Sequence, residues 1–261
     1  MIDFGRLLKR FRTSNSLSQN ELVDLVTSKD NKLVGLDVVT ISRWENWMVV
    51  PTHRRQIEVF QGAHKCFFDV VLANEDLLIH KFRTRIIEKS NVWENTENVQ
   101  LENVVYKEIK SKDEKGNTLY CILYTDRKGI PLGQITYKYL SENDFWHALD
   151  KENNSSVNDK SSEKCLQISS MFCLSNKILP HMLGMVTRQL LLKKINMIGF
   201  SSKNKKSNLK RFLRAVGFKI HKEQQDRTSL VLTYYDALYN KELFYCSILV
   251  GFQGELNVKK V

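Results

Sequence analysis

Residues 38–46, Val-Val-Thr-Ile-Ser-Arg-Trp-Glu-Asn, constrain the fold of this chain more than any other stretch. At helical spacing Ile41 and Trp44 lie on one face, so they predict a short helix with one buried side. Asp37 precedes the segment and suits the N-cap position. A helix this short is not stable by itself. We therefore expect it to pack on neighbouring helices and to leave an open outer face, formed by Val38, Val39, Thr40, Ser42 and Arg43.

Two amphipathic segments upstream supply the packing partners. In the first, Phe4, Leu7, Leu8 and Phe11 recur at i, i+3, i+4 and i+7, which is one face of a helix. The second opens with residues 18–21, Ser-Gln-Asn-Glu, which form a capping-box pattern. We predict a small helical unit, and its third helix, with an open polar face, suits the major groove of DNA.

Two motifs and a proline resemble a known family. They are Leu17-Ser18-Gln19-x-Glu21-Leu22, Ile41-Ser42-Arg43-Trp44-Glu45 and Pro51. Together they are similar to the helix-turn-helix of phage-repressor (Xre-type) transcriptional regulators, over roughly the first quarter of the chain. The resemblance implies that two valines and an arginine read bases, that a glutamine touches DNA, and that two polar residues contact phosphates. The implied DNA-binding residues are Gln19, Val38, Val39, Thr40, Arg43 and Asn46.

The same resemblance implies a structural ion pair. It would join Arg12, near the end of the first helix, to Glu45 at the end of the recognition helix. The chain also departs from the family in two places. Extra residues near 28–36 lengthen the turn before the recognition helix, which affects the docking angle. Trp47 stands where the family has a glycine, which affects the end of that helix.

Net charge and cysteine content indicate which partners and which kinds of site to expect. The formal net charge of +11 favours polyanionic partners such as DNA, with a basic solvated surface as the alternative. The cysteines are odd in number and include no C-x-x-C pair, so we expect reduced thiols and neither a disulfide framework nor a metal site. They are Cys66, Cys121, Cys165, Cys173 and Cys246.

The sequence shows no targeting segment. The first helix carries several basic residues where a signal peptide would have an apolar core, and no uncharged apolar run approaches membrane-spanning length. We therefore expect a cytoplasmic protein with no membrane partner.

Composition changes suggest three regions. Residues 1–62 form the helix-turn-helix domain, and residues 63–95 a helical connector with an apolar stripe. Either this stripe belongs to the core of the first domain or it forms a dimer interface, and both alternatives stay open. Residues 96–261 form a second domain, after a polar, Asn-rich boundary.

The pattern of the second domain predicts an α+β fold. The expected fold class of the whole chain is therefore α+β in two domains, of which the first is all-helical. In the second domain the pattern predicts a mixed sheet of about six strands with flanking helices, including one strand–helix–strand unit with parallel strands. The expected strands are 104–109, 119–125, 133–140, 166–174, 195–200, 218–221 and 229–235. The expected helices are 176–194, 206–216 and one around Phe145 and Trp146.

The order of these elements, together with Leu209-x-x-Phe212-Leu213-x-x-Val216-Gly217-Phe218, resembles the second half of the Gcn5-related acyltransferase (GNAT) fold. An active member would carry a Gln/Arg-x-x-Gly-x-Gly/Ala loop whose backbone N–H groups bind a cofactor pyrophosphate. Residues 174–184 here contain one glycine, Gly184, and a proline, Pro180, which has no N–H to donate. We therefore predict no cofactor.

Individual reactive side chains favour structural roles. His181 beside Pro180 could be a catalytic base, but a loop histidine without a function is the stronger interpretation. Cys173 on an apolar strand and Tyr234 in a Tyr-Tyr pair could each serve catalysis, but packing is the stronger interpretation, so no catalytic residue is predicted. The basic run 203–222 is either a solvated helix face, a second phosphate contact, or the rim of an anionic ligand site.

Two functions remain in competition. In the first, the protein is a sequence-specific transcriptional regulator whose GNAT-like domain serves dimerisation or small-ligand sensing. In the second, that domain is an active N-acyltransferase fused to a DNA-binding domain. We favour the first, because the pyrophosphate loop is missing. The expected partners are double-stranded DNA, a second copy of the chain and a small-molecule effector.

Overall fold

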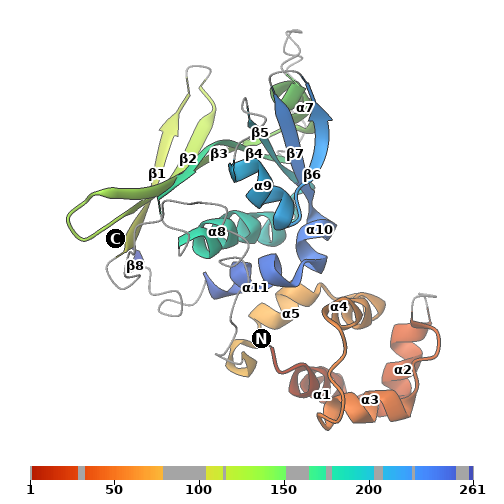
Figure 1. Cartoon of the computed structure of the whole chain (residues 1–261). Coiled ribbons are helices and arrows are strands. Elements are labelled where there is room, and N and C mark those ends of the chain that lie inside the picture. Colours follow the sequence, from red (N-terminus) through yellow and green to blue (C-terminus); the bar gives the residue numbers. More distant parts are fainter. Residues whose placement is uncertain are drawn as a thin grey trace. The chain divides into compact units, whose positions relative to one another are not determined.

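The chain divides into two compact units, Met1–Arg83 and Thr84–Val261 (Figure 1). The computed structural model describes residues 2–28, 33–78, 104–113, 116–150, 165–174, 178–202, 208–224, 227–250 and 259–260. The boundaries expected from the sequence, after residues 62 and 95, differ from this two-part division. Residue 95 lies outside the described residues.

The first unit is helical throughout its described part. Its α-helices are α1 Phe4–Ser14, α2 Gln19–Thr27, α3 Val38–Glu45, α4 His53–Gly62 and α5 Phe67–Leu72, followed by the 3-10 turn η2 Glu75–Leu77. Aromatic rings form the centre of the core. The ring of Phe4 lies 6.0 Å from that of Trp44 and 6.1 Å from that of Phe60, and Phe60 stacks on Phe67 at 5.5 Å. The core thus joins α1, α3, α4 and α5.

The described part of the apolar stripe beyond residue 62 packs in this core, since Phe67, Phe68 and Val71 have no exposed surface. The helical connector expected over 63–95 is not one continuous helix in its described part, because α5 ends at Leu72 and the 3-10 turn follows. Residues 79–89 lie outside the described residues.

The second unit contains a mixed sheet of eight strands in its described part, where β8 is added to the seven strand ranges expected from the sequence. The strand order is β6-β7-β5-β4-β3-β2-β1-β8, and only β4–β5 and β1–β8 pair in parallel. The strands are β1 Val105–Lys112, β2 Thr118–Thr125, β3 Pro131–Leu140, β4 Cys165–Cys173, β5 Met197–Ser202, β6 Lys219–Glu223, β7 Thr228–Thr233 and β8 Lys259–Lys260. The uncharged strand β4 is central, as its composition predicts.

Helices cover both faces of the sheet. They are α7 Glu142–Asp150, α8 Leu179–Leu192, α9 Asn208–Ala215, α10 Tyr234–Tyr239 and α11 Lys241–Leu249. Two neighbouring residues of β3 show which helix covers each face of the sheet. Leu140 packs in a cluster with Phe145 of α7, whereas the Tyr139 hydroxyl donates to Gln189 of α8. Because successive strand side chains point to opposite faces, α7 and α8 lie on opposite sides of the sheet.

Helices α10 and α11 are absent from the sequence-based prediction. The expected strand 229–235 ends at Thr233, and Tyr234 begins α10 instead. The reason is a helix cap, since Thr233 Oγ1 accepts a hydrogen bond from the Asp236 backbone N–H at 3.1 Å. Tyr234 is therefore a helix residue, and the expected Tyr-Tyr strand pair does not exist. No helix in the described residues is long and apolar enough to span a bilayer.

Candidate functional site

Helix α3 begins and packs as its sequence dictates. Asp37 Oδ1 accepts a hydrogen bond from the Thr40 backbone N–H at 2.7 Å. Hydrogen bonding from Thr40 lowers the pKa of Asp37 and so keeps this cap charged near neutral pH. On the inner side, Ile41 is fully buried and Trp44 is 6% exposed. This packing fixes which residues face outward.

The outer face of α3 is open. Val39 is 54% exposed, and Arg43 is exposed and forms no hydrogen bond or ion pair with the described residues. Val38, Thr40 and Ser42 are half-buried beside them. Arg43 follows Val39 by one helical turn, so the two side chains share one side of the helix. The Arg43 charge contributes to the lowered pKa of Asp37, but the guanidinium donates no hydrogen bond to a described residue. A guanidinium of this kind beside an exposed apolar side chain is suited to base edges in a major groove.

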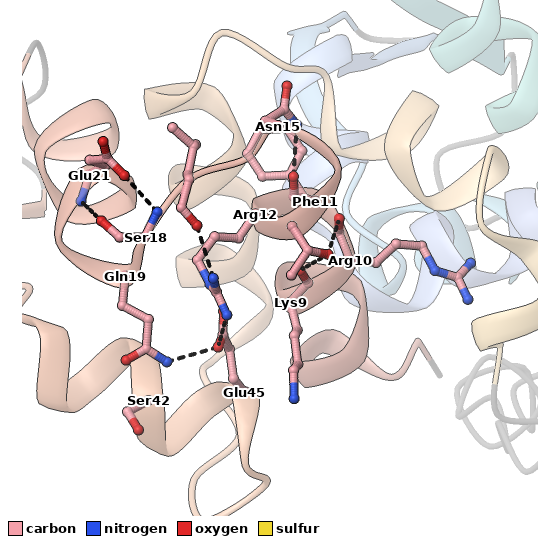
Figure 2. Close-up of polar contacts among 12 residues, drawn as sticks. Lys9, Arg10, Phe11, Arg12, Asn15, Ser18, Gln19, Glu21, Ser42 and Glu45 are labelled. Carbon is pink, nitrogen blue, oxygen red and sulfur yellow. Dashed lines mark hydrogen bonds and ion pairs between the residues drawn. The ribbon is translucent and has the colours of Figure 1, made fainter.

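A buried polar network connects α1, α2 and α3 (Figure 2). Arg12 donates to both carboxylate oxygens of Glu45, Nε to Oε1 at 2.7 Å and Nη2 to Oε2 at 3.1 Å. The Glu45 side chain is only 3% exposed, so the ion pair expected from the sequence is present and largely shielded from water. The remaining Arg12 nitrogen, Nη1, donates to the Leu17 carbonyl at 2.9 Å, which fixes the turn between α1 and α2.

The network also orients Gln19. Its Nε2 donates to Glu45 Oε2 at 2.9 Å, so the amide group is held by the end of α3. The amide oxygen of Gln19 remains as an acceptor, and Figure 2 shows it directed away from Glu45. The sequence analysis expects Gln19 to contact DNA but could not predict this orientation, because it depends on a contact between two helices.

The segment after α3 differs from the glycine turn of the resembled family. Trp47 adopts a positive φ of 63°, a left-handed conformation that favours glycine. Residues 47–50 are all exposed, with Met48 at 75%. Asn46, an expected phosphate contact, donates its amide Nδ2 to the Ser42 carbonyl at 2.9 Å. In the lengthened turn before α3, residues 29–32 lie outside the described residues, and Leu33 and Leu36 anchor its end in the core.

In the second unit, the parallel strands β4 and β5 separate along their length. They pair from Cys165–Met197 to Ile168–Phe200, after which β4 continues to Cys173 on β3 and β5 continues to Ser202 on β7. The separation begins next to a register irregularity between β3 and β4. The carboxyl ends of parallel strands are where open α/β sheets bind ligands. This point is therefore the candidate ligand crevice of the second unit.

The helix that follows β4 does not supply the phosphate-binding loop of the GNAT fold. The N-cap residue of α8 is Ile178, which has no side-chain capping bond, and Pro180 lies in the first turn. Gly184 faces α11, where an added Cβ would lie 2.5 Å from the Cys246 carbonyl oxygen. The one glycine of this segment thus permits close helix packing. Residues 175–177 lie outside the described residues.

The histidine at the start of α8 is buried. His181 is 4% exposed, its Nδ1 lies 2.9 Å from the Tyr124 hydroxyl, and its ring lies 4.9 Å from the ring of Tyr106. Burial lowers the pKa of His181 to about 4 and raises that of Tyr124 well above its usual value. Both groups are therefore neutral near pH 7. The expectation of a loop histidine is wrong, because His181 lies in the first turns of α8 and packs in the core.

Cys173 lies close to the His181–Tyr124 pair. It ends β4 in a half-buried position, it pairs with Gly133, which in turn pairs with Tyr124, and its charge contributes to the raised pKa of Tyr124. Tyr234 begins α10. No group of three or more His, Cys, Asp or Glu side chains that could hold a metal ion occurs among the described residues.

Comparisons with known proteins identify no family by sequence. No family model matches the chain, and no curated protein matches it. Solved structures do match. One is a GNAT-family acetyltransferase from Listeria monocytogenes, with TM-score 0.32 and 12% identity over 43% of this chain and 63% of that chain. Another is the N-acetyltransferase PseH from Campylobacter jejuni in complex with acetyl coenzyme A, with TM-score 0.30 and 12% identity over 44% of this chain and 67% of that chain.

A third match is RimJ from Mycobacterium smegmatis in complex with CoA-disulfide, with TM-score 0.32 and 13% identity over 52% of this chain and 62% of that chain. This chain spans less than two thirds of the Listeria and Mycobacterium proteins. Likenesses this weak assign neither an activity nor a substrate, and these three say nothing of DNA binding.

The Arg12–Glu45 pair should contribute far more to stability than the exposed pair that Arg10, also on α1, forms with Asp76 of η2. Replacing Arg12 with Met leaves a buried carboxylate without its cation, which costs about 3–5 kcal/mol. Arg10 and Asp76 are 46% and 61% exposed, so Arg10→Met should cost less than about 1 kcal/mol. Urea unfolding of the two variants measures both free energies, and equal losses would contradict the structural role of the Arg12 network.

His181 should make the second unit sensitive to acid. Its folded pKa of about 4 lies below the ordinary histidine pKa of 6.5, so the unfolded chain binds the proton first as the pH falls. The stability contribution is fully present above pH 6.5 and is lost towards pH 4. When the pH falls from 7 to 4.5, the unfolding free energy of His181→Leu should decrease by roughly 2–3 kcal/mol less than that of the parent protein.

The measurement is the unfolding free energy at both pH values. His147→Gln, at an exposed position on α7, is the control and should keep the pH dependence of the parent. If His181→Leu also keeps that pH dependence, His181 titrates normally in the folded protein.

Proposed function

We propose that the protein binds specific DNA sequences through helix α3 and acts as a transcriptional regulator. The observation that carries this proposal is the open outer face of α3, with Arg43 unpaired among the described residues, on a helix fixed by the Arg12–Glu45–Gln19 network. A rigid helix with free donors meets the main requirement for reading base edges. The net charge of +11 supports association with a polyanion.

Each residue of this interface has a distinct role in the proposal. The Arg43 guanidinium donates two hydrogen bonds to guanine O6 and N7. Val38 and Val39 have no hydrogen-bonding side chain, so they contact thymine methyl groups. The Gln19 amide oxygen accepts a hydrogen bond from a base amino group, because its Nε2 is engaged by Glu45. Thr40 and Asn46 contact phosphates.

A helix-turn-helix unit makes few base contacts, so we propose that the protein binds two half-sites as a homodimer. Because the apolar residues of α5 are buried within the first unit, the second unit is the better candidate for the dimer contact. Its crevice between β4 and β5 is proposed to bind a small-molecule effector.

The decisive experiment replaces Arg43. Binding sites are first selected from random duplexes by the full-length protein, and affinities are then measured by fluorescence anisotropy. Arg43→Ala should weaken binding to the selected site by roughly 1–3 kcal/mol and leave binding to random duplex almost unchanged. The reason is that a bidentate base contact carries sequence information whereas a phosphate contact does not.

Lys65→Ala is the control, because this exposed cation lies between α4 and α5 and away from α3 in the chain. It should reduce both affinities equally and slightly. The proposal fails if Arg43→Ala lowers affinity by the same factor on selected and random DNA, or if no site is enriched.

A second candidate function rests on the separation of β4 from β5, which opens the sheet where an acyl-CoA would lie in the GNAT fold. In this alternative the second unit is an N-acyltransferase and the first unit directs it to DNA. Burial of His181 and the packing role of Gly184 leave this alternative without an assigned base or phosphate loop.

Thermal unfolding with acetyl-CoA separates the two functions. A ligand at 100 times its Kd should stabilise the folded state by about 2.7 kcal/mol. We expect no shift in the melting temperature at millimolar acetyl-CoA. A clear stabilisation, together with thiol release on incubation with amine substrates, would favour the acyltransferase.

A further inference from the structure

The outer face of helix α9 concentrates positive charge. Residues 203–222 contain eight Lys or Arg and no acidic residue. Within α9 the apolar side chains of Phe212 and Leu213 are fully buried, whereas Arg211 and Arg214 are exposed. The two arginines are spaced i, i+3, so their side chains are neighbours on one helix face, roughly 5–6 Å apart at Cβ.

The charges of these two arginines are not neutralised by described residues. The lysines nearby differ, since Lys210 Nζ donates to Glu223 at 2.6 Å and Lys219 Nζ donates to Asp236 at 2.6 Å. Neither Arg211 nor Arg214 forms a hydrogen bond or an ion pair within the described ranges. The end of α9 contributes about −0.5 charge, which two guanidinium groups outweigh.

These arginines border a depression at the junction of α9 and β6, which we call the α9–β6 depression. Its volume is about 610 Å³, and it is lined by Arg211, Arg214, Ala215, Phe218, Lys219 and Ile220. Gly217 makes the junction possible, since its φ of 111° reverses the chain between the helix and the strand. The depression therefore combines a cationic rim with apolar surface from Phe218 and Ile220.

We propose that the α9–β6 depression binds the sugar-phosphate backbone of duplex DNA. Guanidinium forks match phosphate oxygens in geometry and charge, and two on one helix face can contact successive phosphates. The apolar surface beside them suits deoxyribose. Such contacts position a protein on DNA without reading its sequence. DNA is proposed as the polyanion because this inference rests on the function proposed for α3, which belongs to the first unit. The α9–β6 depression itself lies in the second unit.

The test uses the full-length double variant Arg211→Gln/Arg214→Gln and a random-sequence duplex. Affinity is measured by fluorescence anisotropy at several salt concentrations. Each lost phosphate contact should reduce the slope of log K against log salt by about 0.9. We expect a slope change of about one to two and several-fold weaker binding at low salt, by equal factors on random and selected duplexes.

The matched control is Lys107→Gln/Lys128→Gln, which removes the same charge from exposed positions on β1 and in the β2–β3 turn. If the control changes the slope as much as the arginine variant does, net charge alone is responsible and the site is overturned. Unchanged binding of the arginine variant would overturn it as well. Thermal unfolding of both variants confirms that they are folded.

The two proposals can fail separately in this experiment. If Arg43→Ala affects random and selected DNA alike while the arginine variant still lowers the slope, the α9–β6 depression stands and α3 is not the reading helix. If Arg43→Ala removes only sequence preference and the arginine variant resembles its lysine control, α3 stands and the depression does not bind DNA.

Discussion

The buried ion pair between Arg12 and Glu45 is the interaction on which the first unit depends. A carboxylate that is 3% exposed is stable only with a cation and further donors, and Arg12 and Gln19 supply them from α1 and α2. Because Glu45 ends α3, the same bonds fix the orientation of that helix. The open face of α3 is therefore presented by a rigid support and does not depend on a ligand to form.

Much of the first unit could be predicted from sequence because its signals are local. The capping box of Ser18 and Glu21 forms, and Asp37 caps α3 as expected. Helical spacing correctly separated buried Ile41 and Trp44 from exposed Val39 and Arg43. The orientation of the Gln19 amide could not be predicted, since it depends on a contact between residues 26 positions apart.

The second unit shows where local signals fail. Helix α11 is buried on all sides, so its sequence has no amphipathic period to indicate a helix. Helix α10 was taken for strand because Tyr234 and Tyr235 continue an apolar run, although Thr233 and Asp236 form a Thr-x-x-Asp cap that signals a helix start. The central strands were predictable, since β4 and β5 are short and bounded, and a strand–helix–strand unit requires parallel pairing.

Gly184 explains why a GNAT-like order of elements does not by itself imply GNAT chemistry. In a phosphate-binding loop, glycine lets backbone N–H groups approach an anion. Here the glycine lies inside α8 and lets that helix approach the backbone of α11. The buried His181–Tyr124 pair likewise fills the start of α8 with neutral groups held in the core. The described start of α8 is thus occupied by packing contacts, while Arg211 and Arg214 of α9 are exposed and form no ion pair with the described residues. Anion binding in the second unit is therefore better sought at the α9–β6 depression than at the start of α8.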